Sequence, residues 1–264
     1  MDIESFRGSW ALVTGASSGI GREYARALAR SGLKLILVAQ NRDELEKTAI
    51  EMRAIGAPDA TFCAVDLSVT GAGRTVYAFA EESGAHVRFI VNAAAVGKWG
   101  RFELADSSFY ENMLQVDIAA LVTLTREFFP HLASFPSSVV VNVASGAAFQ
   151  PVPYMNAYAA AKAFVLHFSL ALFFEWEIYG IYVQTLVPGP TATNFDERAG
   201  AYASALKRRD SPEKVVAASL AHLAARTPLV DAAGGTYMQR FFAGVFPIRF
   251  VLKKVARMFQ PPGE

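Results

Sequence analysis

Six short runs of apolar residues alternate along this chain with longer stretches that have the pattern of helices, and this alternation limits the fold more than any other feature. The runs are apolar throughout instead of alternating with polar residues, which indicates strands buried on both faces of a parallel sheet. They lie at residues 10–14, 34–39, 60–65, 88–91, 139–143 and 182–187. The helical stretches between them include 25–29, 43–55, 73–82, 106–133 and 154–179. The pattern predicts an α/β fold with helices on both faces of the sheet.

The composition favours a single domain that spans residues 1–264. Hydrophobic residues make up 53% of the chain and charged residues 19%, which excludes a disordered protein and favours an extensively buried sheet. A chain of this length can bury a substantial core. No linker, low-complexity stretch or repeat interrupts the alternation of strands and helices, so we expect one domain.

The regular pattern ends after the sixth apolar run. The Pro-Gly-Pro sequence at 188–190 terminates that run, and residues 191–209 have an irregular or weakly helical pattern. The Ser-Pro pair at 211–212 is typical of a helix start, and this helix is expected to end near residue 226. We interpret 191–226 as a substrate-loop region and 236–238 as a last edge strand.

The tail at residues 241–264 has an amphipathic helical pattern. One helical stripe is apolar and consists of Ile248, Val251, Leu252, Val255, Ala256 and Phe259. The opposite side is basic and contains Arg249, Lys253, Lys254 and Arg257. Two interpretations stay open, of which the first is favoured. The apolar stripe packs on the domain or on a subunit partner, or the helix lies on a membrane surface.

Charge and cysteine content exclude several other classes of protein. A net charge of +1 gives no electrostatic argument for nucleic-acid binding. The lone Cys63 excludes an intrachain disulfide and a cysteine-rich metal site, so we expect no metal and a cytoplasmic location. Residues 1–9 are mixed and charged, so no signal peptide is expected. The longest apolar helix candidate, 163–174, contains His167 and is expected to be too short to span a bilayer.

Residues 14–21 read Thr-Gly-Ala-Ser-Ser-Gly-Ile-Gly and join the first strand to the first helix. Glycines at 15, 19 and 21 permit a tight turn and a close approach of the backbone to a diphosphate. The diphosphate charge would then lie over the helix N-terminus. A glycine-rich loop alone is a weak signal, but the strand-to-helix context makes a dinucleotide site the preferred interpretation.

Tyr158 and Lys162 are four residues apart in an Ala-rich stretch, so a helix would present both on one face. A phenolate at neutral pH costs about 4 kcal/mol because the pKa of tyrosine is near 10. A positive charge about 4 Å away in a partly screened site offsets about the same amount. Lys162 is therefore expected to lower the pKa of Tyr158 for proton transfer, and Ser145 is placed to hold the substrate oxygen.

These motifs together resemble the short-chain dehydrogenase/reductase family. They are the glycine turn, Asp66-Leu67, Asn92-Ala93-Ala94-Ala95, Ser145, Tyr158-x-x-x-Lys162 and Pro188-Gly189, and the match covers about residues 10–195. The resemblance implies a single-domain, doubly wound Rossmann fold with seven parallel strands in the order 3-2-1-4-5-6-7, followed here by a C-terminal helical extension. It also implies hydride transfer between a nicotinamide dinucleotide and a carbonyl or alcohol.

The resemblance also assigns roles to individual residues. Tyr158 would be the general acid or base, Ser145 would bind the substrate oxygen, and Lys162 would hold the nicotinamide ribose. Thr193 resembles the family threonine that contacts the carboxamide or phosphate end of the cofactor. The full set of expected cofactor-binding residues is Gly15, Ser17, Ser18, Gly19, Ile20, Gly21, Gln40, Asn41, Arg42, Asp66, Leu67, Asn92, Tyr158, Lys162, Pro188, Gly189 and Thr193.

The end of the second strand favours NADP(H) over NAD(H). A carboxylate there would bind the ribose hydroxyls of NAD and repel a 2′-phosphate, but no acidic residue occurs between Ala39 and Arg42. Arg22 and Arg42 are expected near this pocket. Against this, Gln40 stands where many NADP-preferring relatives carry arginine, and both arginines would also fit solvated helix positions.

Two positions depart from the family pattern. The family usually has Asn-Asn-Ala-Gly where this chain has Asn92-Ala93-Ala94-Ala95, which implies a reshaped turn. Asp117 stands where the family commonly has the asparagine of a catalytic tetrad. A buried aspartate without a partner would be costly or would take up a proton. Asp117 is therefore a candidate relay residue, and a helix-bend hydrogen bond without a catalytic part is an equal alternative.

The walls of the substrate pocket are expected to be apolar. They are assigned to Ala147, Phe149, Val152, Met155, Phe195, Tyr202, Phe241, Phe242 and Phe246. This lining favours a hydrophobic ketone or secondary alcohol, of fatty-acyl, steroid-like or aromatic type. The alternative is a dinucleotide-binding sensor or scaffold that has lost efficient turnover. The family also implies a homodimer or homotetramer built on the long helices before and after the fifth strand.

Overall fold

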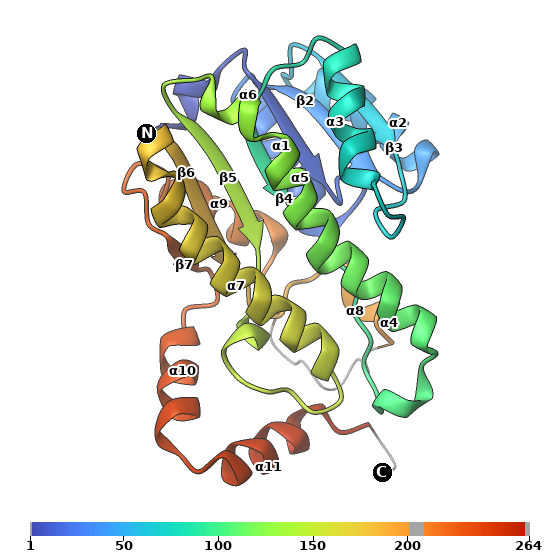
Figure 1. Ribbon diagram of the computed structural model, residues 1–264, viewed down its shortest axis with the longest axis vertical. Coiled ribbons are helices and arrows are strands. Elements are labelled where there is room, and N and C mark those ends of the chain that lie inside the picture. Colours follow the sequence, from blue (N-terminus) through green and yellow to red (C-terminus); the bar gives the residue numbers. More distant parts are fainter. Residues whose placement is uncertain (1, 201–208, 262–264) are drawn as a thin grey trace.

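The centre of the molecule is one seven-stranded sheet in which all paired strands are parallel (Figure 1). The computed structural model describes residues 2–200 and 209–261. The strands are β1 (Trp10–Thr14), β2 (Lys34–Ala39), β3 (Ala60–Ala64), β4 (Val87–Asn92), β5 (Ser138–Val143), β6 (Ile181–Val187) and β7 (Leu229–Asp231). Their spatial order is β3-β2-β1-β4-β5-β6-β7, which confirms the predicted order. The order reverses between β1 and β4, where ligands bind in sheets of this type.

The seventh strand is not the predicted one. Residues 236–238 lie in helix α10 (Thr236–Val245), and the edge strand is β7, whose Val230 pairs with Leu186 of β6. The strand ends because the Asp231 carboxylate accepts hydrogen bonds from the backbone N–H groups of residues 233–235. The resulting turn leads into α10, so the apolar residues that resembled a strand begin a helix.

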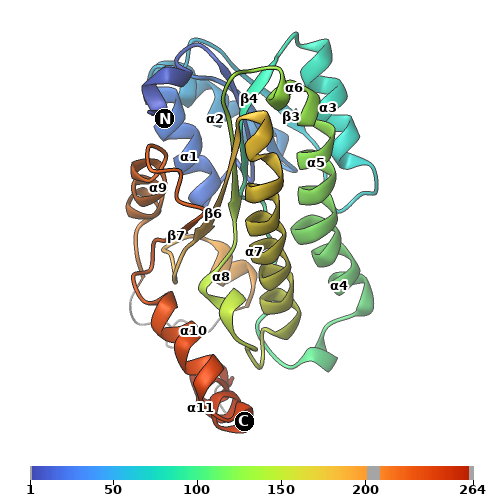
Figure 2. The ribbon, with the colours of Figure 1, turned by 60° about the vertical axis from the view of Figure 1, so that its left-hand side comes forward.

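Helices cover both faces of the sheet (Figure 2). One face carries α1 (Gly19–Arg30), α2 (Arg42–Ala54) and α9 (Pro212–Ala221), and the other carries α3 (Ala72–Glu82), α5 (Leu121–Glu127) and α7 (Asn156–Trp176). Successive side chains of β1 point to opposite faces. Val13 belongs to the core that contains Leu28 of α1, whereas Leu12 belongs to the core that contains Leu124 of α5. The continuous apolar strands thus follow from burial on both sides.

The long helix predicted for residues 106–133 is interrupted. It consists of α4 (Ser107–Leu114), a π-helical segment η3 (Gln115–Ala120), α5 and α6 (Phe129–Ala133). Pro130 at the start of α6 lacks a backbone N–H, so the helix cannot run through this position unbroken. The π-helical segment contains Asp117 and lies beside the candidate site. The sequence pattern predicts that this segment is helical, but it does not predict the π-helical segment or the break at Pro130.

Helix α7 is longer than the predicted apolar run of 163–174, and a 3-10 turn, η5 (Glu177–Tyr179), continues it. Asn156–Tyr179 is long and apolar enough to cross a membrane, so the prediction that this helix is too short is wrong. Val165 and Leu166 of this helix are nevertheless buried in the fold, and Leu172 packs in the core beneath β5 and β6. We therefore assign α7 to the core of the domain.

The C-terminal segment forms two helices at the carboxyl ends of the strands (Figure 1). They are α10 and α11 (Ile248–Phe259), and the helix predicted from the stripe at 248–259 is confirmed. Val251 and Val255 of that stripe are buried. They pack with Val152 and Met155 of the domain, as the favoured interpretation of the tail predicts.

Candidate active site

The glycine turn at the end of β1 forms a cradle, a concave backbone surface that side chains on its glycines would fill. Gly15 and Gly19 have left-handed backbones with φ of +67° and +55°. A Cβ on Gly21 would lie 2.4 Å from the carbonyl oxygen of Gly15. Ser17, Ser18 and Ile20 complete the turn, and Ser18 is the N-cap of α1 without a side-chain capping bond. The turn therefore fits the close approach of a dinucleotide diphosphate to the start of α1.

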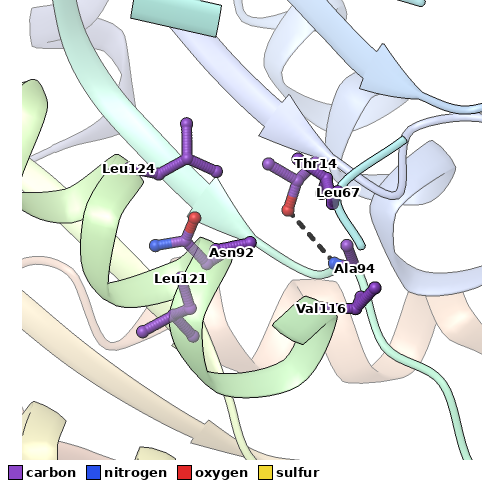
Figure 3. A pocket seen from close by; sticks show the side chains of 8 residues that line it. Thr14, Leu67, Asn92, Ala94, Val116, Leu121 and Leu124 are labelled. Carbon is purple, nitrogen blue, oxygen red and sulfur yellow. Dashed lines mark hydrogen bonds between the residues drawn. The ribbon is translucent and has the colours of Figure 1, made fainter. Parts of the chain in front are cut away.

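Thr14 fixes the neighbouring loop at the point where the strand order reverses (Figure 3). Its Oγ1 accepts hydrogen bonds from the backbone N–H groups of Ala93 and Ala94 at 3.0 and 3.1 Å. A small pocket opens beside it, and Leu67, Asn92 and Val116 line this pocket. The sequence analysis missed this role of Thr14, although its place directly before the glycine turn was a usable signal.

Asn92 does not point freely into the cofactor cleft. Its side chain is buried, and its Nδ2 donates hydrogen bonds to Thr125 at 3.1 Å and to Asn142 at 2.8 Å. Asn142 in turn donates to Ser169 of α7 at 2.9 Å. Asn92 therefore links β4 to β5 and α5 through hydrogen bonds, and its side chain stabilises the elements that carry the site.

The residues after β2 and β3 lie together at the expected adenosine end. Gln40, Asn41 and Arg42 are exposed, and Gln40 donates a hydrogen bond to Asp66 at 2.9 Å. Asn41 accepts a hydrogen bond from the backbone of Glu44 and so caps α2. The Arg42 guanidinium lies over the Phe62 ring, 5.5 Å from its centroid. These groups offer an exposed, uncrowded surface for a ribose or its phosphate.

Arg22 is less available than the sequence indicates. Its guanidinium forms an ion pair with Glu51 of α2 at 2.6 Å, and Arg26 pairs with the other oxygen of the same carboxylate. These two cations lower the pKa of Glu51 against the effect of its partial burial, so the carboxylate is held charged. Of the two arginines only Arg42 is exposed, whereas Arg22 is half-buried and paired, so the prediction of NADP(H) depends on Arg42.

Ser145, Tyr158 and Lys162 come together at the carboxyl end of β5. Ser145 caps the 3-10 turn η4 (Gly146–Phe149), and its hydroxyl is near enough to Tyr158 to lower the pKa of that phenol. Tyr158 and Lys162 lie one turn apart on α7, with the ammonium 5.6 Å from the centroid of the Tyr158 ring. Lys162 is buried and donates a hydrogen bond to the carbonyl of Val143 at 3.2 Å. The expected side chains are thus adjacent.

Asp117 joins this group from the π-helical segment. Its carboxylate is 1% exposed, its Oδ1 accepts a hydrogen bond from the backbone N–H of Val96 at 2.7 Å, and its Oδ2 lies 3.4 Å from Nζ of Lys162. Burial raises the pKa of Asp117, and the nearby ammonium and the Val96 hydrogen bond oppose this shift. One carboxylate oxygen therefore holds the loop after β4 through Val96, and the other faces Lys162, so the predicted helix-bend hydrogen bond is replaced by a bond to that loop.

The electrostatics of Tyr158 differ from the expectation. Burial raises its pKa above the ordinary value, the negative charge of Asp117 raises it further, and hydrogen bonding with Ser145 lowers it. The prediction that Lys162 lowers the pKa of Tyr158 is therefore wrong for this structure. The physical reason is that Asp117 compensates the charge of Lys162 at short range, while the phenol itself is removed from water.

The loop after β6 closes over the same site. The carbonyl of Pro188 accepts a hydrogen bond from the backbone of Gly146, and Gly189 lies against Ala233, where a Cβ would come within 2.9 Å. Thr193 packs against Gly19 of the glycine turn. The next residues form α8 (Phe195–Arg198), and the ring of Phe195 lies 5.1 Å from that of Tyr158. The loop thus connects the glycine turn to Tyr158.

Part of the predicted apolar wall is present. Val152, Met155, Ala147 and Phe195 pack in one cluster with Tyr158, and Trp99, Val251 and Val255 complete it. Phe149 packs in a different cluster. Phe241, Phe242 and Phe246 are exposed on or beside α10 and are not part of this cluster, so their place in the pocket wall stays a prediction. Tyr202 lies outside the described residues.

Comparisons with known proteins agree with this arrangement. The sequence profile of the short chain dehydrogenase family matches residues 9–204. The chain is 30% identical over 219 residues to very-long-chain 3-oxoacyl-CoA reductase-A of Danio rerio, covering 81% of this chain and 66% of that one. It is 31% identical over 198 residues to inactive hydroxysteroid dehydrogenase-like protein 1 of Homo sapiens, covering 73% and 59%. The chain therefore spans less than two thirds of the length of these relatives.

Solved structures resemble the chain over most of its length. A short-chain dehydrogenase from Sphingobium yanoikuyae in complex with NADPH has a TM-score of 0.79 at 27% identity, covering 90% of this chain and 96% of that one. A 3-ketoacyl-(acyl-carrier-protein) reductase from Brucella melitensis complexed with NADH has a TM-score of 0.76 at 26% identity, covering 86% and 96%. These likenesses support a nicotinamide dinucleotide as the cofactor and leave the choice between its two forms open.

Proposed function

The chain belongs to the short-chain dehydrogenase/reductase family, and from this premise we propose that it transfers a hydride between NADP(H) and a hydrophobic ketone or secondary alcohol. The observation that carries the proposal is that Ser145, Tyr158 and Lys162 lie together, and that the loop after β6 joins them to the glycine turn through Thr193 and Phe195. A fatty-acyl, steroid-like or aromatic substrate fits the apolar cluster that contains Tyr158, Val152 and Met155.

Each catalytic side chain has a defined part in this proposal. When bound, the nicotinamide supplies or accepts the hydride at the substrate carbon. Tyr158 gives its proton to the substrate oxygen during ketone reduction, or takes the hydroxyl proton during alcohol oxidation. Ser145 donates a hydrogen bond to the same oxygen and so fixes its position. Lys162 holds the nicotinamide ribose while it stays bonded to the carbonyl of Val143.

The preference for NADP(H) rests on the surface beyond β2. No carboxylate occurs there before Asp43, and Arg42 is exposed at the N-terminus of α2. A guanidinium at this position binds a 2′-phosphate, whereas an acidic residue would repel it. Because Arg22 is paired with Glu51, we assign the preference to Arg42 alone.

A second candidate function is dinucleotide binding with little turnover, as a sensor or scaffold. It is favoured by the ion pair between Asp117 and Lys162, which offsets the charge that would activate Tyr158. Two similar proteins, from Pongo abelii and Homo sapiens, also have "inactive" in their names. The retained Ser145, Tyr158 and Lys162 favour the enzyme.

A substrate screen distinguishes the two candidates. Oxidation of NADPH is measured with a panel of hydrophobic ketones, and reduction of NADP with the matching alcohols, while binding of both dinucleotides is measured by calorimetry. Turnover of a hydrophobic ketone supports the enzyme. Tight dinucleotide binding without turnover on any member of the panel supports the sensor, and turnover limited to small charged ketones contradicts the proposed substrate class.

We further propose a homodimer or homotetramer that resides in the cytoplasm. Phe164, Phe174 and Ile178 of α7 and η5 and Leu114 of α4 expose large apolar side chains on neighbouring helices, which suits a subunit contact. Analytical ultracentrifugation tests the assembly. A monomer at micromolar concentration would contradict this part of the proposal.

A further inference from the structure

Helices α10 and α11 and their connection form an elbow, residues 236–259, that exposes much of the apolar surface of the molecule. Figures 1 and 2 show the elbow at the end of the domain that holds the carboxyl ends of the strands. Among the described side chains, the large exposed apolar residues of the elbow are Met238, Phe241, Phe242, Val245, Phe246, Ile248, Phe250 and Met258. A large contiguous apolar patch is rarely left exposed to water, so it usually marks an interaction site.

The aromatic rings of the elbow form a continuous row. The ring of Phe242 stacks on that of Phe246 with centroids 5.2 Å apart, and Phe246 lies 5.5 Å from Phe250. Phe241 lies at the other end of the row, 6.4 Å from Phe242. The row therefore runs from α10 across the bend into α11 and exposes ring surface along this whole length.

Cations lie on the outer side of the same elbow. Arg249, Lys253 and Arg257 are exposed and spaced four residues apart, so they share one face of α11. The ammonium of Lys254 lies 5.4 Å from the centroid of the Phe242 ring, which places positive charge directly beside the aromatic row. The sequence from residue 232 to 263 contains no acidic residue to neutralise these groups.

The inner side of α11 is already occupied. Val251 and Val255 are buried in the cluster that contains Tyr158, and Trp99 donates a hydrogen bond to the carbonyl of Phe259 at 2.8 Å. Apart from Ile248 at its start, the apolar stripe predicted from the sequence is therefore not an exposed surface that a membrane would contact. The exposed aromatic row is a different surface, and only the folded structure places it beside the cations.

We propose that the elbow docks on the surface of an anionic lipid bilayer, with the aromatic row in the interface and the cations against the lipid headgroups. A mixed aromatic and basic surface is suited to that environment. A second copy of the chain fits this surface poorly. A symmetric contact would bury the cations of both elbows in one interface, because both partners of a twofold interface use the same patch, and residues 232–263 contain no acidic residue to neutralise them.

Docking would also orient the active site toward the membrane, a consequence that rests on the proposed function. The inner side of α11 covers the cluster that contains Tyr158, Val152 and Met155. A hydrophobic substrate dissolved in the bilayer would then reach this cluster beside the elbow without crossing water.

Vesicle sedimentation tests the docking without any need for turnover. The intact protein is mixed with vesicles of phosphatidylcholine alone, or of equal amounts of phosphatidylcholine and phosphatidylserine, at low and high salt. We expect binding to the mixed vesicles at low salt, at least tenfold weaker binding to phosphatidylcholine, and weaker binding at high salt. No sedimentation with the mixed vesicles would overturn the proposal.

Two elbow variants and one matched control complete the test. Phe241→Ser with Phe246→Ser, and Lys253→Glu with Arg257→Glu, should each lower binding to the mixed vesicles at least tenfold. The control changes Ile50→Ser with Val69→Ser, two exposed apolar side chains outside the elbow, and should bind as the unchanged protein does. Retained NADPH binding verifies the fold of each variant. Equal vesicle binding by all variants would overturn docking. The proposal would also fail if the elbow variants dissociate an oligomer of the protein while the unchanged protein does not sediment with vesicles.

Discussion

The ammonium of Lys162 lies 3.4 Å from Oδ2 of Asp117, and both side chains are buried. The lysine that would activate Tyr158 thus has a counter-ion before any ligand binds. Two buried charges so close interact strongly, and removing one of them leaves the other uncompensated. The charge that Tyr158 experiences is therefore set by the Asp117–Lys162 pair.

Asp117→Asn should lower the pKa of Tyr158. The substitution removes a negative charge that disfavours the phenolate and leaves the positive charge of Lys162 without its partner, and both changes stabilise the phenolate. Alcohol oxidation needs the phenolate as a base. Its rate should therefore begin to rise at a pH lower by about 1 unit or more. Ketone reduction needs the protonated phenol, so its rate should fall at a correspondingly lower pH.

Asp196→Asn is the matched control for that experiment. The Asp196 carboxylate also raises the pKa of Tyr158, but its effect is smaller than that of Asp117, and it is paired with Arg209 at 3.2 Å. We expect a smaller displacement of the pH–rate profile. In Asp117→Asn the new amide oxygen can still accept the hydrogen bond from Val96. An unchanged profile in that variant would remove Asp117 from the mechanism.

Tyr158→Phe should lower turnover by about 100-fold to 10,000-fold, the usual contribution of a positioned acid or base. The ring that packs against Phe195 is retained, so the cluster and the dinucleotide site should stay intact. Steady-state kinetics and NADPH titration measure the two effects separately. Full activity would refute the assignment, and a parallel loss of NADPH binding would show a structural effect instead.

Gly21→Ala should weaken dinucleotide binding and lower the melting temperature. The new Cβ would lie 2.4 Å from the carbonyl oxygen of Gly15, which is backbone and can relieve the overlap only if the turn shifts. Gly235→Ala is the control, because a Cβ there meets nothing within 4 Å. Calorimetric titration with NADPH and thermal unfolding measure both effects. Equal behaviour of the two variants would contradict the role of Gly21 in shaping the cradle.

Six strands could be predicted because each is a continuous apolar run with a clear end. The seventh could not, since Leu229–Asp231 has three residues and only Val230 is buried. The sequence instead placed a last strand at residues 236–238, but these residues begin α10, directly after the turn that Asp231 holds. These hydrogen bonds join a side chain to the backbone two to four residues further on, and they leave no periodic apolar signal in the sequence.

The candidate site, like the fold, could be predicted from the sequence only in part. Tyr158 and Lys162 could be paired from the sequence because they lie one turn apart on a helix. The approach of Asp117 to Lys162 joins two helices that are distant in sequence, so no spacing rule reveals it. The sequence therefore predicted that Tyr158 and Lys162 lie together, but it assigned the pKa of Tyr158 the wrong direction.

Arg42→Ala should reduce the preference for NADPH over NADH. The exposed guanidinium is free to contact a 2′-phosphate because its contact in the structure is with the ring of Phe62. Its loss should weaken NADPH binding by about tenfold, as expected for a charge-assisted hydrogen bond worth about 1.5 kcal/mol or more, and leave NADH binding nearly unchanged. Arg22→Ala is the control, since Arg22 is committed to Glu51 at 2.6 Å. The test measures the dissociation constants of NADPH and NADH for the unchanged protein and for both variants. Equal or tighter binding of NADH by the unchanged protein would contradict the NADP(H) assignment, and selective loss of NADPH in Arg22→Ala would transfer the role to that residue.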